Sequence, residues 1–143
     1  MPDRYRVFVY GTLKKGFPNH DRCMPQARLE GIFRTRERYR LVLNGERHSP
    51  CMIAGSGKGH NVIGELYTVD DAGLAQMDRL ERVDRPNGYR RHRIMVERVD
   101  PPSSDIQEAF AYLKPPADVD DPRSDPLESY TPEQARLYRS RQG

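Results

Sequence analysis

Short apolar runs, separated by connections rich in glycine and proline, dominate the chain. The first run, residues 6–10, is apolar at Val7, Phe8 and Val9 in succession. Consecutive apolar positions are typical of a strand with neighbours on both sides, so we expect this strand to be central. Further runs with strand character follow at residues 29–35, 38–43, 62–69, 89–99 and 106–113.

One segment has a helical pattern. Asp70 is a good N-cap for a helix over residues 71–83, and Asp71 places a negative charge in its first turn, where the helix dipole favours one. A proline and an Asn-Gly pair end the pattern. Two shorter helices are predicted, one within residues 18–26 and one at residues 133–139, which starts from Thr131.

Six or seven strands with so few helices predict an α+β fold, namely a small, mainly antiparallel β-barrel or strongly curved sheet with flanking helices. The 143 residues fit one domain, 1–143. Residues 114–130 are acidic and rich in proline, with little apolar surface to bury, so we expect a loop or tail that wraps around this domain.

Composition excludes several classes of protein. Lys and Arg number 24 against 21 Asp and Glu, a net charge of 24 − 21 = +3, which is too small to predict a nucleic-acid partner. No apolar run reaches the roughly 18 residues of a membrane span, and no signal-peptide pattern is present. Cys23 and Cys51 lie far apart, without the spacing of a zinc site. We expect a cytoplasmic monomer with no metal and no cofactor.

Glu81 breaks the amphipathic pattern of the predicted helix. At about 100° per residue it falls within roughly 40° of Leu74 and Met77, inside the apolar stripe. Partial burial and the C-terminal helix turn would both raise the pKa of this carboxyl, as in a catalytic acid or base. The alternative is that the helix frays before Glu81, which then enters solvent or pairs with Arg82, Arg85 or Arg90.

The glycine after the first strand suggests a second candidate site. A sharp turn through Tyr10, Gly11, Thr12 and Leu13 can direct successive backbone N–H groups into one space, a nest that binds a carboxylate or an oxyanion. The alternative is a simple tight turn with Gly11 at positive φ.

These two sites together resemble the γ-glutamylcyclotransferase family, and specifically its γ-glutamylamine cyclotransferase branch. The resemblance rests on VFVYGTLKKG followed by PNH, on GSGKGHNVIGELYTVD, on MDRLE with its glutamate at Glu81, and on GYRR. These motifs fall between Val7 and Arg93, and little beyond them can be aligned.

The resemblance implies an enzyme without a cofactor. In this reaction the α-amine of a γ-glutamyl group attacks its own γ-carbonyl, which releases 5-oxoproline and a free amine. Glu81 would be the general acid/base. Tyr10, Gly11, Thr12 and Leu13 would bind the glutamyl end, at its α-carboxylate or at the oxyanion. A γ-glutamyl-ε-lysine compound is the expected small-molecule substrate, with other γ-glutamyl compounds as alternatives.

A non-catalytic binding module is the alternative function. Arginines at every second position from Arg34 to Arg40 would line one face of a strand, where they could bind an acidic partner or RNA or simply be solvated. Four polar residues could lie near a pocket mouth: His20, His48, Arg34 and Asp84.

Overall fold

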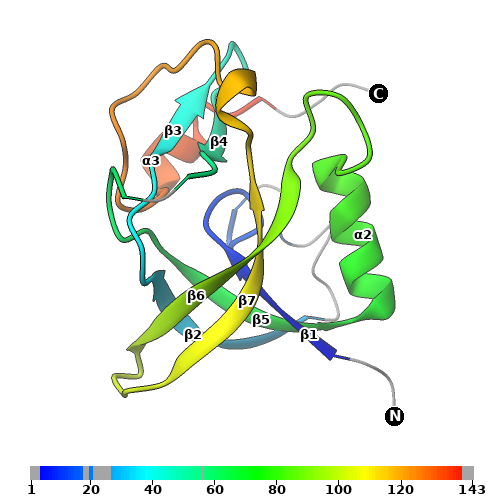
Figure 1. Ribbon diagram of the computed structural model, residues 1–143, viewed down its shortest axis with the longest axis vertical. Helices are drawn as coiled ribbons and strands as arrows, with labels where there is room; N and C mark the ends of the chain where they lie inside the picture. Colours follow the sequence, from blue (N-terminus) through cyan, green and yellow to red (C-terminus); the bar gives the residue numbers. More distant parts are fainter. Residues whose placement is uncertain (1–3, 18–19, 21–26, 56, 140–143) are drawn as a thin grey trace.

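A closed five-stranded barrel forms the body of the protein (Figure 1). The computed structural model describes residues 4–17, 20, 27–55 and 57–139. The barrel strands are β1 (Arg4–Val9), β2 (Arg28–Thr35), β5 (Ile63–Asp70), β6 (Arg90–Asp100) and β7 (Ile106–Leu113). They follow the order β1-β5-β2-β6-β7, and β1 pairs antiparallel with β5 and parallel with β7. The predicted fold class and the central position of the first strand are confirmed.

The continuous apolar run of β1 is explained by burial on both faces of the strand. Phe8 points into the barrel core, where it packs in a cluster with Phe33. Val7 and Val9 point outward, into a second cluster that contains Met77 of the helix α2 (Asp71–Glu81). Because its side chains belong to both clusters, β1 joins the two halves of the core. The burial of each such side chain contributes about 1.5–3 kcal/mol to the free energy of unfolding.

The short strands β3 (Leu41–Asn44) and β4 (Ser49–Met52) form a separate hairpin beyond one end of the barrel (Figure 1). The sequence predicted a strand at residues 38–43 and missed β4. Tyr39 makes only an isolated bridge to His60, so the strand starts later than expected. Ser-Pro-Cys-Met has neither alternation nor β-branched residues, which is why its pattern gave no strand.

Helix α2 begins as the sequence predicts. The Asp70 side chain accepts a hydrogen bond of 2.8 Å from the backbone N–H of Gly73, which caps the helix. Leu74 and Met77 are buried against the barrel, which confirms the apolar stripe. The helix ends at Glu81, two residues earlier than expected, because Arg82 adopts the left-handed conformation at the C-cap.

The segment from Lys114 to Tyr130 follows the outside of the β3–β4 hairpin. Its backbone donates to β3 twice: Leu127 N–H donates to Leu41 O and Arg123 N–H to Leu43 O, each at 2.7 Å. Backbone hydrogen bonds therefore help to order this polar segment, and Tyr130 and Leu127 fix it further by packing on the barrel core. It leads to the short helix α3 (Pro132–Ala135), which Thr131 and Gln134 cap reciprocally. The predicted helix at residues 18–26, and Cys23 with it, lies outside the described residues except for His20.

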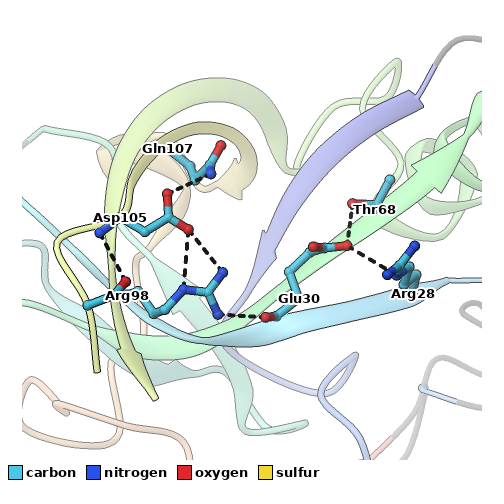
Figure 2. Close-up of polar contacts among 7 residues, drawn as sticks. Arg28, Glu30, Thr68, Arg98, Asp105 and Gln107 are labelled. Atoms are coloured by element: carbon cyan, nitrogen blue, oxygen red, sulfur yellow. Dashed lines mark hydrogen bonds and ion pairs between the residues drawn. The ribbon is translucent and has the colours of Figure 1, made fainter. Parts of the chain in front are cut away.

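A polar network closes the barrel wall at a bulge in β2 (Figure 2). Arg98 of β6 pairs with Asp105 at 2.9 Å and donates to the Glu30 carbonyl at 2.7 Å. Gly31, at φ +150°, lets the guanidinium pass, since a Cβ there would lie 2.5 Å from Arg98 Nη1. This network lies on the barrel strands, away from the hairpin. No helix in the described part of the chain has both the length and the apolar character of a membrane span.

Candidate active site

The chain turns sharply where β1 ends. Gly11 follows Tyr10 there, and its φ lies outside the left-handed region, so the interpretation as a tight turn with Gly11 at positive φ is wrong. The reason for glycine is space: a Cβ at this position would lie 2.7 Å from Cγ of Pro50 in β4. Gly11 therefore lets the turn pack directly against the β3–β4 hairpin.

Only some of the backbone N–H groups of this turn form hydrogen bonds within the described part of the chain. Lys14 N–H donates to Gly11 O at 3.1 Å, and Lys15 N–H donates to the Glu65 carboxylate at 2.7 Å. Gly11 and Leu13 do not donate their own N–H groups to any partner among the described residues. Anion-binding nests use successive backbone N–H groups, and the N–H groups of Gly11 and Leu13 are the candidates for such a role in this turn.

The Tyr10 side chain connects this turn to two neighbouring strands. Its hydroxyl donates to Tyr112 O at 2.6 Å and accepts from Met52 N–H at 3.3 Å, and the ring is 6% exposed. It thus joins β7 to β4. Burial, followed by the negative charge of Glu81, raises the pKa of Tyr10 well above its ordinary value.

Glu81 is the last residue of α2 and is partly buried. Its carbonyl accepts from Tyr89 N–H at 2.9 Å, which fixes the end of the helix to the start of β6. Its negative charge is one of the causes, after burial, that raise the pKa of three further groups: Cys51, Tyr89 and Tyr112. The carboxylate therefore lies close to the buried groups that join β4, β6 and β7.

One cavity of about 160 Å³ brings these parts together. Its lining includes all five residues that the sequence singled out: Tyr10, Gly11, Thr12, Leu13 and Glu81. Among the described residues that line it, Glu81 is the only carboxylate, while the cations are Arg47, Arg79 and Arg82. The described lining thus combines one carboxylate with several cations and the backbone of the turn at residues 10–13.

Several lining residues could not be found from the sequence. The hairpin supplies Arg47, Ser49 and Pro50, and the segment after α3 supplies Tyr138. These residues carry no local motif, and only the folded path of the chain brings them to the cavity. Arg47 Nε donates to Arg139 O, and Arg139 N–H donates to Arg47 O, both at 2.9 Å, so the C-terminal segment is held against the hairpin.

The four residues that could have lain at a pocket mouth are not in the cavity lining: His20, His48, Arg34 and Asp84. The predicted arginine face of one strand does not form, because β2 ends at Thr35 and only Arg34 of the series lies in it. Arg34 and Arg36 both pair with Glu97, at 2.9 and 3.7 Å. The described residues contain no group of three potential metal ligands.

A family model described as gamma-glutamyl cyclotransferase, AIG2-like, matches residues 7–132. The chain belongs to this family. The match extends well past Arg93, where the recognisable motifs end, and includes most of the segment that wraps the hairpin.

Relatives and solved structures agree with this membership. The chain is 39% identical over 113 residues to a zebrafish gamma-glutamylaminecyclotransferase B, a match that covers 76% of this chain and 58% of the relative. It is 34% identical to the human gamma-glutamylaminecyclotransferase, covering 88% and 91%. A crystal structure of a mouse AIG2-like protein superposes with a TM-score of 0.80 at 33% identity, covering 98% of both chains. Against several mammalian and fish relatives the matched region spans only 55–62% of their length.

Proposed function

We propose that this protein is a γ-glutamylamine cyclotransferase in which Glu81 is the general acid/base. The observation that supports this most is that one cavity is lined both by Glu81, at the end of α2, and by the turn of residues 10–13. The names of the relatives that the chain resembles support the same activity.

The reaction moves two protons from the α-nitrogen to the leaving nitrogen and closes one ring. The α-ammonium of the γ-glutamyl group gives the first proton to the Glu81 carboxylate, and the resulting amine attacks the γ-carbonyl carbon. A C–N bond forms in the five-membered ring, and the bond to the leaving nitrogen breaks as that nitrogen takes the proton back from Glu81. The ring nitrogen then loses its second proton, which the released amine takes up as it becomes an ammonium. The products are 5-oxoproline and a protonated amine, with no net proton and no redox change. Acid/base catalysis of this kind contributes about 10²- to 10⁴-fold.

The turn of residues 10–13 would hold the glutamyl end. Backbone N–H groups of Gly11 and Leu13 are available for a substrate carboxylate or for the oxyanion that forms on the γ-carbon. Because the ring closure is intramolecular, holding the glutamyl chain folded with its amine near the carbonyl is the larger part of the task. The rigid floor formed by Tyr10, Tyr112 and Met52 supports that geometry.

The test is 5-oxoproline release from γ-glutamyl-ε-lysine, a γ-glutamyl-α-amino acid and glutathione, with the wild type beside Glu81→Gln. We expect release from γ-glutamyl-ε-lysine and a loss of at least 10²-fold in kcat for Glu81→Gln, with an unchanged far-UV spectrum. Asp84→Asn is the matched control, because Asp84 is an exposed carboxylate three residues on, outside the cavity lining. Release that survives Glu81→Gln would overturn the assignment of Glu81, and no release from any compound would overturn the proposed activity.

A further inference from the structure

Residues 130–139, which we call the C-terminal strap, lie beside the candidate active site. The strap starts at Tyr130, which is 0% exposed, turns through the short helix α3, and reaches the β3–β4 hairpin at Arg139 (Figure 1). Beyond α3 the Tyr138 N–H donates to Ala135 O at 3.1 Å, which continues the helical turn. Within the described lining of the cavity, Tyr138 is the one residue that the strap supplies.

The start of the strap is bonded to the segment that follows the turn of residues 10–13. Lys14 is 8% exposed, and its Nζ donates to Tyr130 O at 2.5 Å. The same ammonium lies 4.6 Å from the centroid of the Phe17 ring, and the Phe17 and Tyr130 rings are 5.6 Å apart. A charge-assisted hydrogen bond from a buried ammonium is stronger than one in water. The strap is therefore joined to the turn that forms one wall of the cavity.

The end of the strap is held by Arg47, in the turn between β3 and β4. Arg47 Nε donates to Arg139 O, and Arg139 N–H donates to Arg47 O, both at 2.9 Å. The guanidinium carbon of Arg47 lies 5.8 Å from the centroid of the Tyr138 ring, within the range of a cation–π contact. Arg47 and Tyr138 both line the cavity. One side chain thus contacts the backbone of the strap and the ring that the strap brings to the active site.

The position of Tyr138 depends on these bonds. Helix α3 has four residues, which is too short for a stable helix by itself. The Tyr10 hydroxyl, by contrast, is bonded to β7 and β4, which belong to the body of the protein. Tyr138 is only partly buried, so its contact with Arg47 decides how closely the ring approaches a bound molecule.

Resting on the proposed cyclotransferase activity, we propose that Arg47 is a positioning residue, which holds the Tyr138 ring as a wall of the active site against which the substrate packs. The ring contacts the substrate before and during the reaction alike, so it contributes to binding and not to proton transfer by Glu81. The hairpin and the C-terminal strap are then working parts of the active site, although neither carries a residue that reacts.

Steady-state kinetics of 5-oxoproline release from γ-glutamyl-ε-lysine test the wall. Tyr138→Ala should raise KM by about tenfold and leave kcat within about twofold of the wild type, because it removes a contact that the ground state and the transition state share. Tyr138→Phe, which keeps the ring, should recover most of this loss. An unchanged KM in Tyr138→Ala would overturn the wall.

A double-mutant cycle tests whether Arg47 acts through Tyr138. Arg47→Met keeps a side chain of similar length and removes the guanidinium, so we expect KM to rise by about fivefold. In the Tyr138→Ala background the same substitution should have no further effect, because the ring that Arg47 positions is gone. A direct contact of Arg47 with the substrate would instead multiply the two effects, and that result would overturn the positioning role. Arg136→Met is the matched control and should leave KM unchanged, since Arg136 is an exposed arginine of the strap outside the cavity lining.

Amide exchange measures the contact between Arg47 and the strap without the reaction. By NMR, the Arg139 amide should exchange with solvent about tenfold faster in Arg47→Met than in the wild type, typical of a lost charge-assisted hydrogen bond. Saturating 5-oxoproline should slow this exchange in the wild type, because it would fill the cavity that Tyr138 lines.

The outcomes separate this proposal from the proposed activity. Wild-type release of 5-oxoproline with an unchanged KM in Tyr138→Ala and Arg47→Met would overturn the positioning role and leave the cyclotransferase activity standing. No release by the wild type would overturn the activity and the role of Tyr138 in it. Equal exchange of the Arg139 amide in the wild type and Arg47→Met would overturn the positioning role of Arg47 whether or not the protein is active.

Discussion

Two buried tyrosines, Tyr10 and Tyr130, should respond oppositely to the loss of the side-chain oxygen atom. The Tyr10 hydroxyl donates to Tyr112 O at 2.6 Å and accepts from Met52 N–H at 3.3 Å. The Tyr130 side chain is 0% exposed, and its hydroxyl has no hydrogen-bond partner among the described residues. Replacement of each tyrosine by phenylalanine removes the same atom from a buried site and changes only the hydrogen bonding.

The expected magnitudes follow from those partners. Tyr10→Phe removes one strong and one longer hydrogen bond and leaves a buried carbonyl and a buried N–H without them, so we expect a loss of about 2 kcal/mol in the free energy of unfolding. Tyr130→Phe removes a buried polar group that lacks a partner, so we expect no loss and a gain of up to about 1 kcal/mol.

Urea unfolding of the wild type and both variants, followed by circular dichroism, measures the difference. For a chain of this size about 2 kcal/mol corresponds to a fall of roughly 6 °C in Tm, which thermal unfolding would check. Equal destabilisation by the two substitutions would refute the reasoning, because it would show that the enclosure of the rings, and not the hydroxyl partners, sets the cost.

Three further predictions follow from other parts of the structure. Gly64→Ala should destabilise the protein by about 2 kcal/mol or more in urea unfolding, because a Cβ there would overlap with Val9 O and the Phe8 ring at the end of β1. The Arg98 guanidinium holds the pKa of the Asp105 carboxyl below its usual range. The ionised Asp105 carboxylate therefore stabilises the fold above about pH 4, and this stabilisation is lost as the pH falls below that value. Asp105→Asn should lower Tm at pH 7 and have no effect at pH 2. Burial raises the pKa of several tyrosines, namely Tyr10, Tyr67, Tyr89 and Tyr112, so stability should decline as the pH rises above about 10, and their phenolate absorbance should appear only together with unfolding.

The sequence predicts those elements whose local pattern and tertiary role agree. The run at Val7 to Val9 is apolar because both faces of β1 are buried, and Asp70 caps α2 through its own side chain. The position of Glu81 could be predicted because a carboxylate in an apolar stripe is visible from angular spacing alone. The strand β4 could not be predicted, since its pairing with β3 and not its own composition makes it a strand.

The candidate site likewise contains some residues that the sequence predicts and others that it does not. The turn at Tyr10 and the carboxylate of Glu81 belong to short motifs, whereas Arg47 and Tyr138 reach the cavity only because the C-terminal segment is bonded to the hairpin. The alternative interpretation of Gly11, a tight turn at positive φ, gave the wrong reason for a glycine at this position. Glycine is required because a larger side chain would overlap with Pro50, and not because of its backbone angle. A contact between segments 39 residues apart leaves no trace in a local pattern.

The hydrogen bonds around the cavity bear on the proposed role of Glu81 as the proton carrier. Four tyrosines line the cavity, and three of them donate their only O–H to the protein: Tyr10 to Tyr112 O, Tyr89 to Pro50 O, and Tyr112 to Asp78. Burial raises the pKa of all three, so they stay protonated at neutral pH and exchange no proton with a substrate. These three phenols keep the walls of the cavity fixed, and Glu81, the one carboxylate in its described lining, is the proposed proton carrier.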